Sequence, residues 1–398
     1  MTGTVATLTW TDSMDLDDPH ATLRRARAQH WWASNAFGIT VLSHDGVRAL
    51  LADARLEGTG MMFLRRFGIT EGPIFEFGSN MLFTNEGDRH RRLRQLVSKA
   101  FTPRAVEKFR PRMRAIAEQF CGTLAEQAED GAVDFVSAFA DPYPAWVLCE
   151  FIGLSHEDAD RFSSLAGDLG LFFSVCIAEE QERITRTIIE LYALMDEVTA
   201  DRRAHPRDDF VTGLVRAEAD GDRLSRDELR VMLVNLVLVG ETARAQAGCT
   251  MGALARHPGQ WAALAAGADV TLAVEETLRW EPAVDYVPRL AVRPVQFGDA
   301  EFEPGTWIEL SLMSANRDEA AYPDPDRFDI ARVAPPVSTF GGGAHYCLGA
   351  ALSRAELQEA IAVLAPRYPH LEPAGTAVWR NVVGGNRCYG ELPLRLRR

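Results

Sequence analysis

The sequence predicts a mainly α-helical protein with a minor β portion. Apolar residues recur at helical spacing through most of the chain, whereas strand-like stretches are short and gather towards its two ends. Proline and glycine concentrate between residues 282 and 345, which indicates a long irregular region. We expect helices over residues 86–101, 104–128, 143–153, 157–169, 179–203, 226–257, 268–280 and 348–366, and strands over residues 38–42, 132–136, 289–297, 306–310 and 392–396.

The chain is expected to form a single unit over residues 1–398. Its length alone would suggest two or three domains. However, the sequence contains no Pro/Gly/Ser-rich linker, repeat or low-complexity tract that would separate them. Residues 315–345 form an irregular connection of a length that is uncommon inside compact proteins and is usually functional.

Composition and charge exclude several classes of protein. The formal net charge of −14 argues against a general nucleic-acid binder, which carries a basic face. No run of apolar residues is long enough for a transmembrane helix, and the acidic first thirty residues do not resemble a signal peptide, so a cytoplasmic location is predicted. The six cysteines include no Cys-x-x-Cys pair, which disfavours a disulfide framework or a metal site built from cysteines alone.

One cysteine stands in an unusual setting. Residues 340–349 read Phe-Gly-Gly-Gly-Ala-His-Tyr-Cys-Leu-Gly, a glycine-rich turn that delivers Cys347 to the start of a helix. The glycines let the backbone pass close to a flat, bulky group, and a helix N-terminus stabilises a thiolate. A buried cysteine after a flexible loop is the simpler interpretation of such a turn, but the full spacing Phe-x-x-Gly-x-x-x-Cys-x-Gly is much rarer.

Three further pairs of residues have spacings that matter chemically. Glu276 and Arg279 lie one helical turn apart and can form an ion pair, and His90 and Arg94 share one helix face. Glu241-Thr242 follows the apolar run 231–240, where a carboxylate is costly unless it is paired or used. Each of the first two pairs alone is more simply explained as part of a solvated helix face, whereas for Glu241 a place on the polar face of a long helix is the less favoured explanation.

Together, in this order and over nearly the whole chain, these motifs resemble the cytochrome P450 family, particularly its soluble bacterial members. The resemblance implies the fold of that family, a helical triangular prism with a small β-rich lobe. It also implies haem b (iron protoporphyrin IX), held between the helix at 226–257 and the helix that follows Cys347. Cys347 would then be the axial ligand, whose thiolate favours O–O cleavage.

The same resemblance assigns roles to other residues. His90, Arg94, Arg289 and His345 match propionate contacts, which is physically reasonable because charge-assisted hydrogen bonds orient an anionic ligand. Phe340 and Gly349 belong with them as cofactor-binding residues of the Cys347 loop. In the structural role, Glu276 and Arg279 would be joined by Arg327 from the segment Tyr-Pro-Asp-Pro-Asp-Arg-Phe at 322–328.

Glu241 and Thr242 match the acid–alcohol pair that delivers protons to dioxygen in the family. One departure concerns the residues just before them. Leu238 and Val239 stand where the family usually has small residues, and the glycine comes later, at Gly240. Either the oxygen pocket is narrower than usual, or the helix distortion is shifted, for which a local π-bulge would be one solution.

The resemblance also suggests which residues contact the substrate. Aromatic and methionine side chains suit an apolar, adaptable pocket, although ordinary core is the more common role of any one of them. Asp285 is polar where an apolar residue is expected, so it indicates a substrate with a cation or N–H donor near the reacting atom, unless it simply faces solvent. The candidates are Met62, Phe75, Phe77, Phe172, Val239, Val284, Asp285 and Val383.

The implied function is a haem-thiolate monooxygenase that uses O₂ to hydroxylate a small organic, secondary-metabolite substrate. The chain has no flavin or iron–sulfur signature, so electrons would come from a ferredoxin and its reductase, docking on a basic patch. A non-oxygenating haem protein is one alternative, disfavoured by Glu241-Thr242. Oxidative coupling or rearrangement of a natural product on the same haem is the other, and the sequence does not exclude it. The residues of the basic patch would be Arg104, Lys108, Arg110, Arg112 and Arg354.

Overall fold

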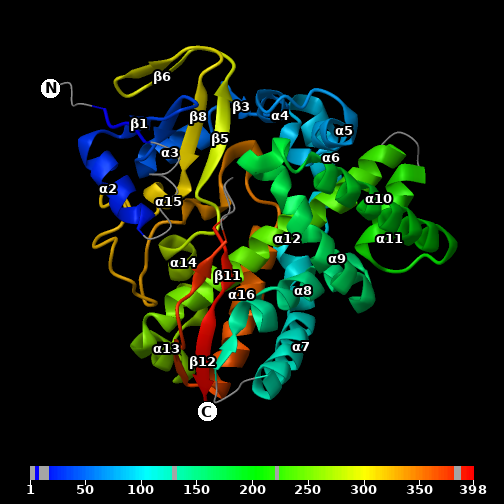
Figure 1. Cartoon of the computed structure of the whole chain (residues 1–398), viewed down its shortest axis with the longest axis vertical. Coiled ribbons are helices and arrows are strands. Elements are labelled where there is room, and N and C mark those ends of the chain that lie inside the picture. The colour runs from blue at the N-terminus through cyan, green and yellow to red at the C-terminus, as the bar shows by residue number, and fades with distance from the viewer. Residues whose placement is uncertain (1–4, 9–17, 128–131, 220–223, 381–386) are drawn as a thin grey trace.

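A computed structural model describes residues 5–8, 18–127, 132–219, 224–380 and 387–398 of the chain. Most of these residues lie in helices, and the strands are short (Figure 1). No helix among the described residues is both long and apolar enough to cross a membrane. The α-helices are α2 (Pro19–Gln29), α3 (His44–Leu51), α4 (Met62–Arg66), α5 (Gly72–Asn80), α6 (Gly87–Ser98), α7 (Pro103–Gln127), α8 (Pro142–Ile152), α9 (His156–Gly170), α10 (Gln181–Ala204), α11 (Phe210–Ala219), α12 (Arg226–Ala255), α13 (Pro258–Ala265), α14 (Val270–Trp280), α15 (Leu312–Ala315) and α16 (Ala350–Arg367).

The strands form four small sheets. The largest has the order β1-β2-β8-β5-β3 and joins the N-terminal part of the chain to the segment after α14, with β2 parallel to β8 and β5 antiparallel to it. The bounds in this sheet are β1 (Trp32–Ser34), β2 (Ile39–Val41), β8 (Trp307–Ser311), β5 (Tyr286–Ala291) and β3 (Leu56–Gly58). The others pair β4 (Ala132–Asp134), β12 (Pro393–Arg397) and β9 (His370–Pro373), then β6 (Val295–Phe297) with β7 (Ala300–Phe302), and β10 (Val378–Trp379) with β11 (Tyr389–Glu391).

The long helix α12 forms the centre of the helical part (Figure 1). It begins with a capping box, in which the Ser225 side chain accepts from the Glu228 backbone N–H and the Glu228 carboxylate accepts from Ser225. Residues on every side of it are buried, because α8, α9, α10, α14 and α16 all pack against it. Such an apolar, all-round buried helix is typical of the core of a large protein.

All eight predicted helices are confirmed, with ends that shift by a few residues. The shorter helices α2 to α5, α11 and α13 were not predicted, because short segments with few buried residues show weak periodicity. The predicted strand at 289–297 is two strands, since β5 ends at Ala291 and β6 begins at Val295. Pro294, which has no N–H to donate to a ladder, lies in the gap between them.

A buried ion pair on α14 organises the irregular segment after β8. Arg279 Nε lies 2.7 Å from Glu276 Oε2, and both side chains are only 1% exposed. The Arg279 guanidinium also donates to the carbonyl oxygens of Asn316 and Pro325. The segment is therefore held by hydrogen bonds to a helix that precedes it in the chain.

The third member of this cluster is Arg332, and the prediction of Arg327 is wrong. The Arg327 side chain is 69% exposed and pairs with Asp329, whereas Arg332 Nε lies 3.2 Å from Glu276 Oε2. Arg332 also donates to the carbonyl oxygens of Pro323 and Asp324. Asp324 has a left-handed φ of 47°, and the turn there folds the chain so that the later arginine reaches α14.

The two arginines should therefore differ in their effect on stability. Arg332→Ala removes a charge-assisted partner from the buried Glu276 carboxylate, so we expect it to lower the free energy of unfolding by about 1–3 kcal/mol. Arg327→Ala is the matched control and should cost less than about 0.5 kcal/mol, because its ion pair is exposed. Urea-unfolding midpoints of both variants measure the difference, and equal losses would contradict the assignment.

Candidate functional site

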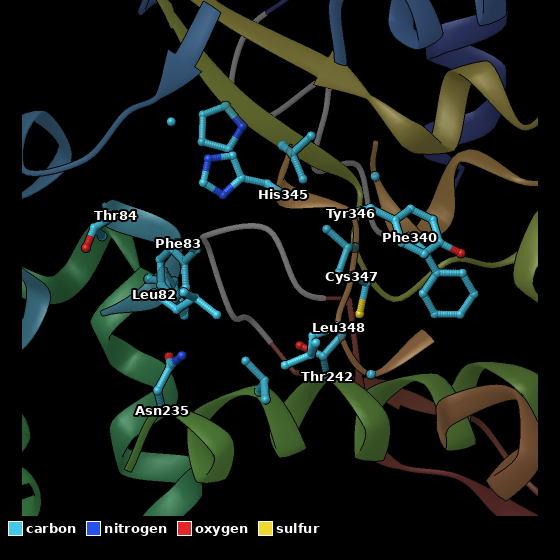
Figure 2. A pocket seen from close by; sticks show the side chains of 18 of the residues that line it. Leu82, Phe83, Thr84, Asn235, Thr242, Phe340, His345, Tyr346, Cys347 and Leu348 are labelled. Atoms are coloured by element: carbon cyan, nitrogen blue, oxygen red, sulfur yellow. The ribbon is translucent and has the colours of Figure 1, made fainter. Parts of the chain in front are cut away.

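A cavity of about 500 Å³ lies between α12 and the loop that leads to Cys347 (Figure 2). Its other walls come from η1 (Leu82–Thr84), η3 (Leu171–Phe173), α4 and β5. The volume and the mostly apolar lining are typical of a site for a sizeable organic ligand. The residues of α12 that line it include Met232, Asn235, Leu236, Val239, Thr242 and Gln246.

The loop before α16 places the Cys347 thiol at the cavity (Figure 2). Gly343 has a φ of 65°, and a Cβ atom there would lie 2.3 Å from the carbonyl oxygen of Leu51, at the end of α3. Only glycine therefore permits this close approach of the loop to α3. The Cys347 N–H donates to the Phe340 carbonyl oxygen at 2.9 Å, which closes the loop three residues before α16 begins.

The Cys347 thiol is accessible from the cavity although it lies inside the protein. Burial raises the pKa of this thiol above its usual value. The Gly349 backbone N–H and the guanidinium groups of Arg94 and Arg354 act in the opposite direction, since they favour the thiolate. The predicted stabilisation at a helix start is thus present, and a cation bound to the thiolate would add to it.

Four basic side chains gather at one side of the cavity, namely His90 and Arg94 of α6, Arg289 of β5, and His345. The His90 and His345 rings lie 4.4 Å apart, and His345 Nε2 lies 2.9 Å from Glu86 Oε1. Burial is the main cause that lowers the pKa of His90 to about 4, and repulsion from His345 is the second cause. His90 Nε2 is buried and has no hydrogen-bond partner among the described residues.

This basic cluster fits a ligand that carries carboxylates. Burial lowers the pKa of both Arg94 and Arg289, because desolvation outweighs the opposing effects of Cys347 and Glu86, respectively. Charge-assisted hydrogen bonds from such groups would orient an anionic group, and the unpaired His90 Nε2 is a ready contact for it. The propionates of a haem with its ring beside Cys347 meet this requirement.

The two residues of the predicted proton-delivery pair face different directions. Thr242 lines the cavity, whereas the Glu241 carboxylate forms an ion pair with Arg244 on the far side of α12. Arg244 also donates to Asp141, with Nη2 2.8 Å from Oδ1. Burial raises the pKa of Glu241 despite the opposing charge of Arg244. Successive helical residues differ by about 100° in direction, which explains the separation.

The helix around this pair is regular. All described residues of 226–255 are α-helical, so the π-bulge that would reconcile Leu238 and Val239 with the family pattern does not occur. Val239 is 45% exposed in the middle of a buried helix because its side chain faces the cavity. Leu238 is buried and is not part of the cavity wall.

The predicted substrate contacts divide into two groups. Phe172, Val239 and Val284 line the cavity. Met62, Phe75 and Phe77 do not line the cavity. Met62 is partly exposed on α4. Phe75 contacts Arg65, and Phe77 contacts the rings of Phe172 and Tyr192. Instead, Met61 and Phe63 line it, a difference of one residue in α4 that apolar composition alone could not resolve. Val383 lies outside the described residues.

Asp285 does not reach the cavity and does not face solvent. Its neighbours Val284 and Tyr286 line the cavity, whereas its own carboxylate lies 4.0 Å from Arg387 Nε. Burial raises the pKa of Asp285 to about 8, although Arg387 opposes the shift. The expectation of a cation or N–H donor opposite Asp285 therefore has no support in this arrangement.

The polar residues of the cavity wall that were missed from the sequence include Asn235 and Glu356. Asn235 interrupts the apolar run 231–240 and stands seven residues before Thr242, so helical spacing placed it on the same face. Glu356 lies on α16, and its Oε1 atom is buried without a partner among the described residues. Burial raises the pKa of Glu356 to about 8.

Comparisons with known proteins agree on one family. A family model described as cytochrome P450 matches residues 162–381. Luteothin monooxygenase of Streptomyces thioluteus is 33% identical over 94% of this chain and 94% of that protein. Mycinamicin IV hydroxylase/epoxidase of Micromonospora griseorubida is 35% identical over 83% of this chain and 81% of that protein.

Solved structures give the same result. The crystal structure of CalO2 superposes with a TM-score of 0.90 at 27% identity and covers 99% of both chains. The cytochrome P450 enzyme CxnD, described as forming a C–S bond in chuangxinmycin biosynthesis, gives a TM-score of 0.88 at 27% identity and covers 98% of both chains. The similarity thus extends over essentially the whole fold.

The pKa of the Glu356 carboxyl tests whether water is excluded from this part of the cavity wall. Between pH 4.5 and about 8 the unfolded chain releases this proton and the folded protein keeps it. The free energy of unfolding should therefore fall with pH, relative to Glu356→Gln, by roughly 1 kcal/mol per pH unit. The difference should become constant above pH 8. Urea unfolding of both proteins across this range measures it, and a difference that does not depend on pH would contradict the assignment.

Proposed function

Since this chain belongs to the cytochrome P450 family, we propose that it oxidises a small, largely apolar secondary metabolite in the cavity between α12 and Cys347. It is a monooxygenase with haem b as its cofactor, and it needs electrons from other proteins. The observation that carries the proposal is that a single cavity brings together the Cys347 thiol, the basic cluster and the Thr242 hydroxyl. The monooxygenases and hydroxylases among its relatives support the same chemistry.

The residues that would hold the haem follow from the geometry of the site. Cys347 would hold haem b through its thiolate, and the haem would supply the activation of dioxygen, which requires two electrons. His90, Arg94, Arg289 and His345 are the proposed partners of its carboxylates, and the buried Arg289 guanidinium and the unpartnered His90 Nε2 support this role. Phe340 and Gly349 also lie at the cavity wall beside Cys347, where a planar ring would need close contact.

The proposed proton route uses both sides of α12. Thr242 would hold a proton at its hydroxyl oxygen inside the cavity, and Glu241 would renew that proton from the far side. The raised pKa of Glu241 favours the protonated carboxyl that this role needs. Glu241 must leave Arg244 to act, and Arg244 keeps Asp141 as a partner when it does. The shared ion pair therefore lowers the cost of this movement.

Oxidative coupling remains a second candidate for the reaction. The similarity to CxnD, an enzyme described as forming a C–S bond, supports it. Product analysis with a substrate that bears both a C–H bond and a nucleophilic group in reach would separate the two. Oxygen from ¹⁸O₂ enters the product of hydroxylation and is absent from the product of coupling.

We further propose a ferredoxin with its reductase as the electron donor. Of the five basic residues considered for docking, Arg110, Arg112 and Arg354 form ion pairs with glutamates of this chain. Arg104 and Lys108, exposed at the start of α7, are thus better placed to meet an acidic partner. Residues 1–398 are proposed to act as one domain, which the pairing of β2 with β8 and of β4 with β12 supports. The cytoplasmic location stays a prediction.

The thiolate ligand is tested by Cys347→Ser. The reduced carbon-monoxide complex of the wild type should show the red-shifted Soret band of thiolate ligation, and the variant should lose it because serine is a far weaker ligand. Cys176→Ser, at an exposed cysteine, is the control and should keep the band. A Cys347→Ser protein that retains the band would show that another residue is the ligand.

Proton delivery is tested by Thr242→Ala and Glu241→Gln. Both should bind a substrate found by a Soret-shift screen but turn over ~10²–10⁴-fold more slowly, the usual contribution of a positioned proton donor. Thr242→Ala should also divert reducing equivalents into hydrogen peroxide. Thr242→Ser retains the hydroxyl and should keep the yield of product per electron.

The rival account is that water or substrate delivers the protons while Glu241 stays on Arg244. Under that account Thr242→Ala and Glu241→Gln would both keep a product yield per electron close to that of the wild type. Product and peroxide measured against reductant consumed decide between the two accounts.

A further inference from the structure

A single polar side chain interrupts the apolar part of α12 that faces the cavity. Met232, Leu236 and Val239 line the cavity there, and Asn235 stands among them on the same helix face. Figure 2 shows the Asn235 carboxamide directed into the cavity, on the side of Leu82, Phe83 and Thr84. The side chain is only 6% exposed, so bulk solvent does not reach it freely.

The Asn235 carboxamide is not used by the protein itself. Its Oδ1 atom is buried and has no hydrogen-bond partner among the described residues. Gln246, three turns further along α12 and also at the cavity, shows the contrast, because it accepts from the Ala283 N–H at 2.9 Å and donates to the Glu281 carbonyl oxygen at 3.1 Å. The Gln246 carboxamide thus stabilises the fold through hydrogen bonds, whereas Asn235 Oδ1 makes none to the described residues.

The surroundings of Asn235 cannot supply the missing partner. Leu82 and Phe83 present apolar side chains, and so do Phe172 and Phe173 across the cavity. The Thr84 hydroxyl points its donor towards the carbonyl oxygens of Gly78 and Met81. A buried carbonyl without a donor destabilises the folded protein, so such groups in native structures usually have a function.

We propose that Asn235 is a specificity-determining residue that binds a hydroxyl or amide N–H on an otherwise apolar substrate. The inference rests on the proposed function, in which oxidation occurs at the end of the cavity marked by Thr242 and Cys347. Asn235 precedes Thr242 by seven residues, which corresponds to roughly 10 Å along an α-helix. The substrate is therefore elongated, with its hydrogen-bond donor roughly 10 Å from the carbon that is oxidised.

Alkylimidazoles provide a probe for this distance. The imidazole nitrogen of N-alkylimidazoles ligates haem iron and shifts the Soret band, so the holoenzyme can be titrated without turnover. We compare two series of increasing chain length, one that ends in a methyl group and one that ends in a hydroxyl. The wild type should prefer the hydroxyl over the methyl terminus by about three- to tenfold at one intermediate length, the effect of one net hydrogen bond.

Two variants and one control make the result specific. Asn235→Leu keeps the branched shape and removes the polar group, and Asn235→Ala removes the group without adding bulk, so both should lose the preference for the hydroxyl. Met232→Leu changes an apolar side chain of the same face one turn earlier and should retain it. The Soret band of the carbon-monoxide complex reports whether each variant binds haem as the wild type does.

The outcomes separate this inference from the proposed function. If imidazole itself produces no Soret shift, no haem iron is accessible at the cavity and the proposed function fails. If imidazole binds but no hydroxyl-ended ligand gains affinity at any length, or if the gain persists in both Asn235 variants, the role of Asn235 is refuted and the proposed function stands. A gain at one length that disappears only in the Asn235 variants establishes the role.

Discussion

The buried pair of Glu276 and Arg279 supplies hydrogen bonds that an irregular stretch of backbone cannot make to itself. Between α15 and Cys347 the chain runs for about thirty residues with almost no regular structure, and parts of it are buried. Its carbonyl and N–H groups still need partners. Arg279 provides donors to the carbonyls of Asn316 and Pro325, and Glu276 accepts the N–H of Asp329. The loop that carries Cys347 starts from this anchored segment.

A long irregular connection normally counts against a predicted fold. Here it is stable because Glu276 and Arg279 supply the hydrogen bonds that its backbone groups would otherwise make within a sheet or a helix. Asn316 extends the same principle, since its side chain bonds to Ser338 and Thr339 near the start of the Cys347 loop. Thr339 in turn donates to the carbonyl oxygen of Leu278, next to the ion pair. The position of the thiol thus depends in part on side chains that do not line the cavity, namely Glu276, Arg279 and Asn316.

The sequence was sufficient for the features that depend on local pattern or a contiguous motif. The fold class, the family, the haem cofactor and the enzyme class are confirmed, and the long helices lie where periodicity placed them. The predictions that failed concern side chains whose position depends on the three-dimensional path of the backbone. Arg332 replaces Arg327 because of the turn at Asp324, and Glu241 lies behind α12 because of its helical phase. The substrate contacts predicted on α4 and α5 do not line the cavity, because the sequence pattern of such short helices does not determine which side faces it.

The basic cluster has a consequence for how the molecule matures. His90, Arg94, Arg289 and His345 approach one another with Glu86 as a neighbouring carboxylate, so a newly synthesised polypeptide brings two arginines together there before the carboxylates of the haem arrive. A ligand that binds only the folded state shifts the equilibrium towards it by mass action. Acquisition of the prosthetic group would therefore also stabilise the folded protein. In a cell short of iron or porphyrin, chains that have not acquired it would expose this region to proteases, so that abundance of the protein would follow cofactor supply.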